Sequence, residues 1–306
     1  MRIAVMGTGG VGGYFGAKLA QAGNDVTFIA RGAHLAALRE RGLRIESGVS
    51  PLHLAGVQAT DDLVRIAPVD VVMFCVKLWD VEQAAAQIEP LVSTGGVVIP
   101  FQNGLAAPEI LERVLGPKRV LGGVAYIAAT IRAPGVIAHT GTMARLRVGA
   151  FPDGPVERAT QFAESCGAAG IDIEVSADIR RALWEKFCFL SALSGCTSVA
   201  RQPVGGIRGD LDLRATFEAA VREAWSVGRA LGVPLADDYV PAQLKALDGL
   251  PAEMRSSMQN DLAGGRRLEA PWLSGAVAAL AKNAGLAAPV SGVLYAALKP
   301  YVAGAT

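Results

Sequence analysis

The sequence predicts an α/β protein in which a doubly wound parallel sheet is followed by an all-helical C-terminal domain. Up to about residue 175, short β-branched runs alternate with amphipathic stretches, which is typical of strand–helix units in a parallel sheet. From about residue 177 the strand-like runs disappear and helical periodicity dominates. A length of 306 residues suits two domains, which we expect at 1–176 and 177–306.

The N-terminal part carries its strands and helices in alternating order. The run VVMFCV at 71–76 is apolar on both faces, as in a central strand that helices cover on each side. Residues 119–149 are typical of hairpins, with turn residues at 133–135 and 139–141, and we expect them to extend the sheet. The other expected elements are strands at 2–7, 25–30 and 96–100 and helices at 10–22 and 80–89.

Helices account for the C-terminal part, where glycines mark helix ends and prolines mark the starts. The apolar surplus of this part could form a core or the interface of a homodimer. The expected helices span 179–194, 208–232, 236–248, 252–263, 270–284 and 290–300.

The composition excludes several classes of protein. The chain has 29 Lys+Arg against 28 Asp+Glu and is 51% hydrophobic, which disfavours disorder and binding to nucleic acid. No charge-free apolar stretch reaches the roughly 18 to 20 residues that cross a bilayer, and the N-terminus lacks the apolar region of a signal peptide. We therefore expect a cytoplasmic protein with no membrane partner. The four cysteines show no CxxC spacing, which favours free buried thiols over a metal site.

A glycine-rich motif follows the first expected strand and opens the first helix. A G-x-G-x-x-G sequence in this context is typical of dinucleotide binding, with glycines for the tight turn, for close approach to a pyrophosphate and for helix packing. The alternative is a structural turn in a glycine-rich chain. The motif reads Gly7-Thr8-Gly9-Gly10-Val11-Gly12.

The cofactor is indicated at the end of the second strand, where an acidic residue would select NAD. The chain has Arg31 there, followed by Gly32. A cation at this point can pair with a 2′-phosphate, so we expect NADP(H). The alternative is that Arg31 is an ordinary surface charge.

Two polar residues follow buried-looking strands. Lys77 comes directly after VVMFCV, and Asn103 follows GVVIPFQ. Because ligands bind at the C-terminal edge of parallel strands, both are candidates for the site. The alternatives are a surface lysine and a helix-capping asparagine.

Lys186 lies in an expected helix that is apolar nearly all round. At helical spacing it shares a face with Leu183, Leu190 and Ser194. Desolvation there would lower the pKa of Lys186 and suit it to proton transfer near neutral pH. Snorkelling of the ammonium to solvent is the alternative, and the residues themselves leave the two open. Further along, Glu269 could cap a helix that begins near Pro271, or could orient a lysine or a substrate hydroxyl.

Taken together, these motifs resemble the ketopantoate reductase (2-dehydropantoate 2-reductase) family over nearly the whole chain. The resemblance implies an N-terminal Rossmann domain and a helical C-terminal domain that together reduce a 2-oxo acid with NADPH. The matching elements are GTGGVG from Gly7, Arg31, VKLWD around Lys77, QNG around Asn103, LWEKF around Lys186, SSMQND around Ser257, and Glu269.

The resemblance also implies residue roles. Lys186 would be the general acid, and Asn103 would touch both nicotinamide and substrate. Lys77, Ala129 and Glu269 match positions that line the cofactor or orient groups around it. Ser257 matches a contact to the substrate carboxylate. The implied reaction converts 2-dehydropantoate to pantoate, in pantothenate and coenzyme A synthesis.

The chain departs from the family pattern at three positions that usually hold asparagine. These positions hold Leu190, Ser194 and Met254, with Ser194 kept here as a substrate contact. Fewer amides make the pocket more apolar, so another 2-oxo or 3-hydroxy acid is a rival substrate. A non-catalytic NADPH sensor is a further alternative. The presence of Lys186, Asn103 and Glu269 argues against it.

Overall fold

The computed structural model describes residues 1–305, which fall into two compact units. The first unit comprises residues 1–102 and 106–182. The second comprises residues 103–105 and the chain from Leu183 onward, so the division lies within one long helix and not at its start.

The first unit is built on a five-stranded parallel sheet with the strand order β5-β2-β1-β6-β7. The order reverses between β1 and β6, which is the doubly wound, Rossmann-type arrangement expected from the sequence. The strands are β1 (Arg2–Met6), β2 (Asp25–Ile29), β5 (Gln58–Thr60), β6 (Val71–Phe74) and β7 (Val97–Pro100). The helices of this unit are α1 (Gly10–Gln21), α2 (Gly32–Arg41), α3 (Val81–Ile88), α4 (Ala106–Leu115) and α5 (Val156–Ala168).

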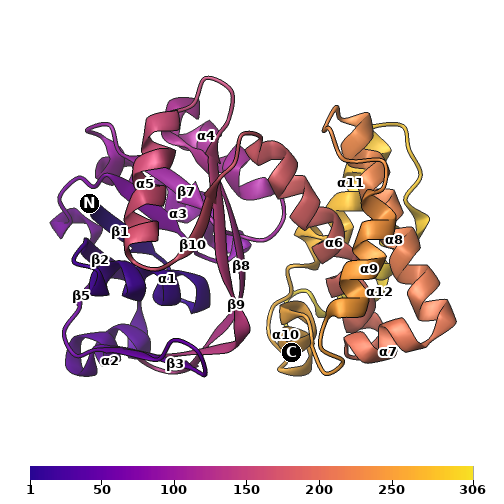
Figure 1. Cartoon of the computed structure of the whole chain (residues 1–306), viewed down its shortest axis with the longest axis horizontal. Helices are drawn as coiled ribbons and strands as arrows, with labels where there is room; N and C mark the ends of the chain where they lie inside the picture. Colours follow the sequence, from indigo (N-terminus) through magenta and orange to yellow (C-terminus); the bar gives the residue numbers. More distant parts are fainter. Residues whose placement is uncertain (306) are drawn as a thin grey trace. The chain divides into compact units, whose positions relative to one another are not determined.

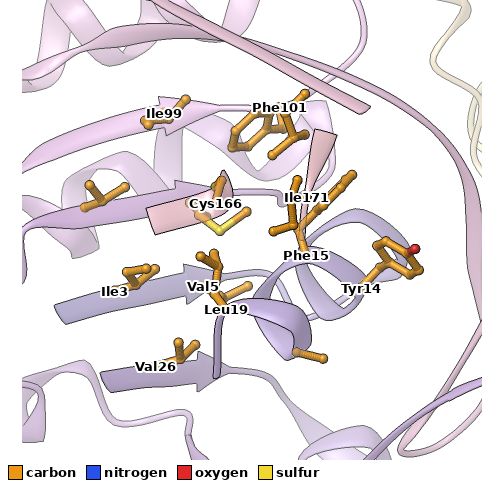
Figure 2. Packing of buried hydrophobic residues seen from close by; sticks show 14 of the residues in the cluster. Ile3, Val5, Tyr14, Phe15, Leu19, Val26, Ile99, Phe101, Cys166 and Ile171 are labelled. Atoms are coloured by element: carbon orange, nitrogen blue, oxygen red, sulfur yellow. The ribbon is translucent and has the colours of Figure 1, made fainter. Parts of the chain in front are cut away.

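The central strands are buried on both faces, as the run VVMFCV predicts. Every residue of β6 and β7 is buried, and Ile3 of β1 pairs with Val26 on one side and Val71 on the other. Helix α1 covers the sheet through Phe15 and Leu19, which are fully buried in the same cluster as Ile3 (Figure 2). Their burial fixes α1 against β1, and with it the loop that joins them.

Residues 119–149 form the expected hairpin, but the hairpin does not extend the first sheet. It consists of β8 (Leu121–Ala133) and β9 (Val136–Ala150). The long strand β9 pairs with β8 along one edge and with β3 (Leu43–Ser47) and β10 (Asp172–Val175) along the other, so a second five-stranded sheet forms, completed by β4 (Leu52–Leu54). A single parallel bridge, Val98–Val120, connects this region to β7. The prediction that the hairpin extends the first sheet was wrong, because β9 also pairs with β3 and β10, which are not its neighbours in the hairpin.

Helices and the loops between them make up the described residues of the second unit, which contain no strand (Figure 1). The expected helix at 208–232 is two helices, because the Asp210 carboxylate accepts a hydrogen bond from Leu213 N and caps a new start. The helix expected at 179–194 continues to residue 200. The helices are α6 (Ile179–Ala200), α7 (Val204–Gly209), α8 (Leu211–Ala230), α9 (Tyr239–Gly249), α10 (Ser257–Ala263), α11 (Ser274–Asn283) and α12 (Pro289–Leu298). Short 3-10 helices lie at Leu63–Arg65, Leu78–Asp80, Glu89–Val92, Pro117–Arg119, Ala270–Trp272 and Lys299–Tyr301.

The cysteines are free thiols, and burial raises the pKa of each of them. Within residues 1–305, no helix is both long enough and apolar enough to span a bilayer. Over the same range, no group of three or more His, Cys, Asp or Glu residues could hold a metal ion.

Candidate active site

The glycine-rich loop is fixed between β1 and α1 by close backbone contacts. Gly7 adopts a φ of +97°, and a Cβ there would lie 2.8 Å from the backbone of Cys75, so the turn requires glycine. Thr8 is buried, and its hydroxyl donates to the carbonyl of Ile29 at 3.0 Å. This bond ties the loop to the last residue of β2.

The start of α1 suits an anionic diphosphate. The first helical bond runs from Gly13 N to Gly9 O at 2.7 Å, and the N–H groups of the turn before it have no partner within the helix. These groups and the helix dipole favour phosphate oxygens. A Cβ on Gly9 would meet nothing within 4 Å, which leaves open space over the loop. The residues present therefore fit the dinucleotide that the motif predicts.

Ala129 lies directly against this loop. A Cβ on Gly10 would lie 2.0 Å from the Ala129 carbonyl oxygen, so α1 touches the backbone of β8 at this point. The register of β8 against β9 shifts between Ile127 and Ala129. Irregular pairing of this kind is common next to functional sites, where it re-aims backbone groups.

Two of the predicted site residues, Arg31 and Lys77, are exposed cations of the first unit. Arg31 is the exposed N-cap residue of α2 and lies two residues after the end of β2. Lys77 follows β6, and its ammonium lies 5.5 Å from the centre of the Trp79 ring. Sequence reasoning missed Gln102, whose amide donates to the carbonyls of Phe74 and Val76, both at 3.0 Å. These bonds tie the segment after β7 to the segment after β6.

Lys186 and Asn103 are joined in the second unit. The partly buried Lys186, on α6, donates from Nζ to Asn103 Oδ1 at 2.9 Å, although the two residues are 83 positions apart. Burial lowers the pKa of Lys186 to about 8, against a smaller opposite effect of the Glu269 carboxylate. A lysine in this state is protonated at neutral pH but gives up its proton more readily than one in water.

Glu269 is buried and begins the 3-10 helix Ala270–Trp272. Its side chain makes no capping bond, so the capping alternative is not what the structure shows. Its carboxylate instead favours the charged form of Lys186. The same short helix supports the asparagine segment, because Gly104 has a φ of +85° and a Cβ there would lie 2.8 Å from the Trp272 carbonyl oxygen. The Asn-Gly dipeptide was the available signal for this turn.

The two serines predicted as substrate contacts differ in exposure. Ser194 is 1% exposed and its hydroxyl has no hydrogen-bond partner among the described residues. Ser257 is exposed at the first position of α10. Sequence reasoning missed the preceding Ser256, which caps α10 at Gln259 N (3.1 Å) and lies 2.8 Å from the Thr197 hydroxyl. These bonds hold α10 against α6.

Leu190 and Met254 both contribute to the hydrophobic packing of the second unit. Each is partly buried and lies against its core cluster. Leu190 follows Lys186 by one helical turn, which puts an apolar side chain next to the ammonium on the same face of α6.

Comparisons with known proteins show the family of the chain. The family models for ketopantoate reductase PanE/ApbA match residues 3–153, and those for its C-terminal part match residues 178–302. The chain belongs to the ketopantoate reductase family. It is therefore an oxidoreductase with a Rossmann-type domain.

Individual relatives match over almost their whole length. A 2-dehydropantoate 2-reductase of Mesorhizobium japonicum is 33% identical, with 92% of each chain covered. An uncharacterised oxidoreductase of Bacillus subtilis, YkpB, is 30% identical, with 99% of each chain covered. The crystal structure of a PanE/ApbA family ketopantoate reductase from Ralstonia eutropha superposes with a TM-score of 0.90 at 31% identity and covers 99% of this chain and 98% of its own.

Proposed function

We propose that this chain reduces a 2-oxo acid to the 2-hydroxy acid with NADPH, and that the substrate is 2-dehydropantoate, reduced to pantoate in pantothenate and coenzyme A synthesis. The family match and the name of the Mesorhizobium japonicum relative support the substrate. The single observation that carries the chemistry is the hydrogen bond of 2.9 Å from Lys186 Nζ to Asn103 Oδ1.

The cofactor, when bound, supplies a hydride equivalent for C2 of the substrate. In the proposal the start of α1 binds the diphosphate, Arg31 binds the 2′-phosphate, and Lys77, Ala129 and Asn103 line the rest of the cofactor. Residues 1–176 would then serve cofactor binding and residues 177–306 substrate binding and proton transfer.

Lys186 is the proposed proton donor. As C2 gains a hydride, the carbonyl oxygen gains negative charge and takes a proton from the Lys186 ammonium, which becomes a neutral amine and is reprotonated from water. Asn103 holds the ammonium through its amide oxygen, which fixes the direction of the Nζ–H groups. Glu269 favours the charged form of Lys186 before the transfer. Ser257 and Ser194 are the proposed contacts to the substrate.

Steady-state reduction of 2-dehydropantoate with NADPH and with NADH tests the proposal. We expect kcat/KM above about 10⁴ M⁻¹s⁻¹ with NADPH, the common lower range for enzymes on their own substrates, and a clear preference for NADPH. A value far below this range, with faster reduction of another 2-oxo acid in a panel, would move the substrate to that acid. Tight NADPH binding without turnover of any carbonyl compound would favour a sensor. The proposed assembly is a homodimer, which light scattering of the purified protein tests.

A further inference from the structure

His34 joins three elements around the proposed cofactor site without belonging to the glycine-rich motif. It lies in the first turn of α2, close in sequence to Arg31. Its Nδ1 accepts a hydrogen bond of 3.1 Å from the backbone N–H of Gly135, in the turn between β8 and β9. The ring also lies close enough to the Thr8 backbone, in the glycine-rich loop, for that backbone to raise its pKa, but its buried Nε2 makes no hydrogen bond among the described residues.

The hydrogen bond determines the state of the imidazole. Because Gly135 N donates to Nδ1, the proton of the neutral ring is on Nε2. Burial lowers the pKa of His34, against a smaller opposite effect of the Thr8 backbone, so Nδ1 stays an acceptor at neutral pH. A protonated ring would set two N–H groups against each other at this contact.

Gly135 is fixed by more than this bond. Gly135 follows Pro134 in a tight turn and has a φ of +80°. Its carbonyl oxygen accepts a hydrogen bond of 2.9 Å from Arg44 N. A Cβ at Gly135 would lie 3.1 Å from Ala37 of α2. The turn of the hairpin therefore packs directly on α2, and the His34 bond is the polar part of that contact.

The same hairpin touches α1 at another point. The Ala129 carbonyl meets Gly10 at the start of α1, whereas the Gly135 N–H meets His34 at the start of α2. Strand β8 thus spans the distance between the first turns of the two helices. In the proposed function, the first turn of α1 binds the diphosphate, and Arg31, the N-cap residue of α2, binds the 2′-phosphate.

We propose that His34 is a positioning residue that sets the distance between the diphosphate site and Arg31, and thereby the preference for NADPH over NADH. The inference rests on the proposed NADPH dependence. Binding of NADH needs only the first of the two sites, since it has no 2′-phosphate. Loss of the hydrogen bond to His34 allows the first turn of α2 to move. This movement weakens the binding of NADPH more than the binding of NADH.

Three substitutions separate this role from general stability. His34→Ala removes the acceptor, and His34→Leu removes it while keeping most of the side-chain volume. His34→Asn keeps an amide oxygen that can accept from Gly135 N–H. His53→Ala is the matched control, because His53 is exposed on β4 and its Nε2 lies 3.1 Å from the Arg41 carbonyl, at the other end of α2.

The readout is the ratio of kcat/KM with NADPH to kcat/KM with NADH, measured with melting temperatures for all variants. We expect His34→Ala and His34→Leu to lower the ratio by about three- to tenfold, which corresponds to the net contribution of one hydrogen bond. We expect the kcat of both variants to stay within about twofold of the wild type. We expect His34→Asn and His53→Ala to keep the ratio within about twofold of the wild type. If His34→Ala does not fold, the ratio measured for His34→Leu tests the role of His34.

An unchanged ratio in the folded Ala or Leu variant overturns the role of His34, as does an Asn variant that loses as much as the Ala variant. A wild-type enzyme without a preference for NADPH overturns the cofactor assignment itself, and the positioning role with it. The failure of the inference and the failure of the proposed function therefore give different results.

Discussion

In the proposed mechanism the Glu269 carboxylate favours the protonated form of Lys186, so Glu269→Gln should change the pH dependence of the reaction. Burial lowers the pKa of Lys186 to about 8, and Glu269 opposes this effect. A general acid works in its protonated form, so activity is present below pH 8 and is lost as the pH rises through that value. Glutamine keeps the shape of the side chain and removes only the charge.

The magnitude follows from the titration of a single group. With a pKa of about 8, Lys186 is about half protonated at pH 8 and about nine-tenths protonated at pH 7. A neighbouring opposite charge changes a pKa by about 1 to 3, so the smallest change would bring Lys186 to about 7 in the variant. About a tenth would then be protonated at pH 8, and kcat/KM at that pH would fall about fivefold. At pH 6 the loss would be small.

The assay is kcat/KM for the 2-oxo acid from pH 5.5 to pH 9.5 at saturating NADPH. We expect the alkaline limb of Glu269→Gln to move to lower pH, while Glu269→Asp, which keeps the charge, stays closer to the wild type. If the alkaline limb of the pH profile of Glu269→Gln lies at the same pH as in the wild type, and the melting temperature is unchanged, the electrostatic coupling between Glu269 and Lys186 is refuted.

Three further substitutions test the cofactor half. Arg31→Glu should lower the preference for NADPH over NADH at least about tenfold, because a charge-assisted hydrogen bond becomes a repulsion; a variant that keeps its preference in steady-state kinetics contradicts the assignment. Gly10→Ala should destabilise the protein by about 1–3 kcal/mol in denaturant unfolding, since its Cβ would lie 2.0 Å from the Ala129 carbonyl oxygen. Gly9→Ala has nothing within 4 Å of its Cβ, so it should keep wild-type stability and raise only the KM for NADPH. Equal stability of the two alanine variants would contradict the account of the loop.

The fold was largely predictable because its signals are local. A parallel strand buried on both faces has to be apolar throughout, and VVMFCV shows this in one short run. Helix ends carry glycine and proline for backbone reasons that do not depend on the rest of the chain. The pairing of β9 with β3 and β10 was not predictable, because its register depends on strands that are far apart in sequence.

For the candidate site, the sequence indicates residue types, whereas their contacts come only from the structure. The sequence indicates Lys186 as a lysine in an apolar helix, and only the structure shows that Asn103 accepts its hydrogen bond. Helical spacing puts Ser194 on the face of Lys186, but it does not reveal that the hydroxyl is enclosed. His34 had no signal of its own, since its partner Gly135 lies 101 positions away.

The central claim is that Lys186 supplies the proton, and Lys186→Ala tests it most directly. NADPH affinity is measured by titration, and kcat is measured with the best 2-oxo acid. We predict an NADPH Kd within a few-fold of the wild type and a kcat lower by about 10² to 10⁴, the usual contribution of a general acid. Near-normal turnover in the alanine variant would contradict the account.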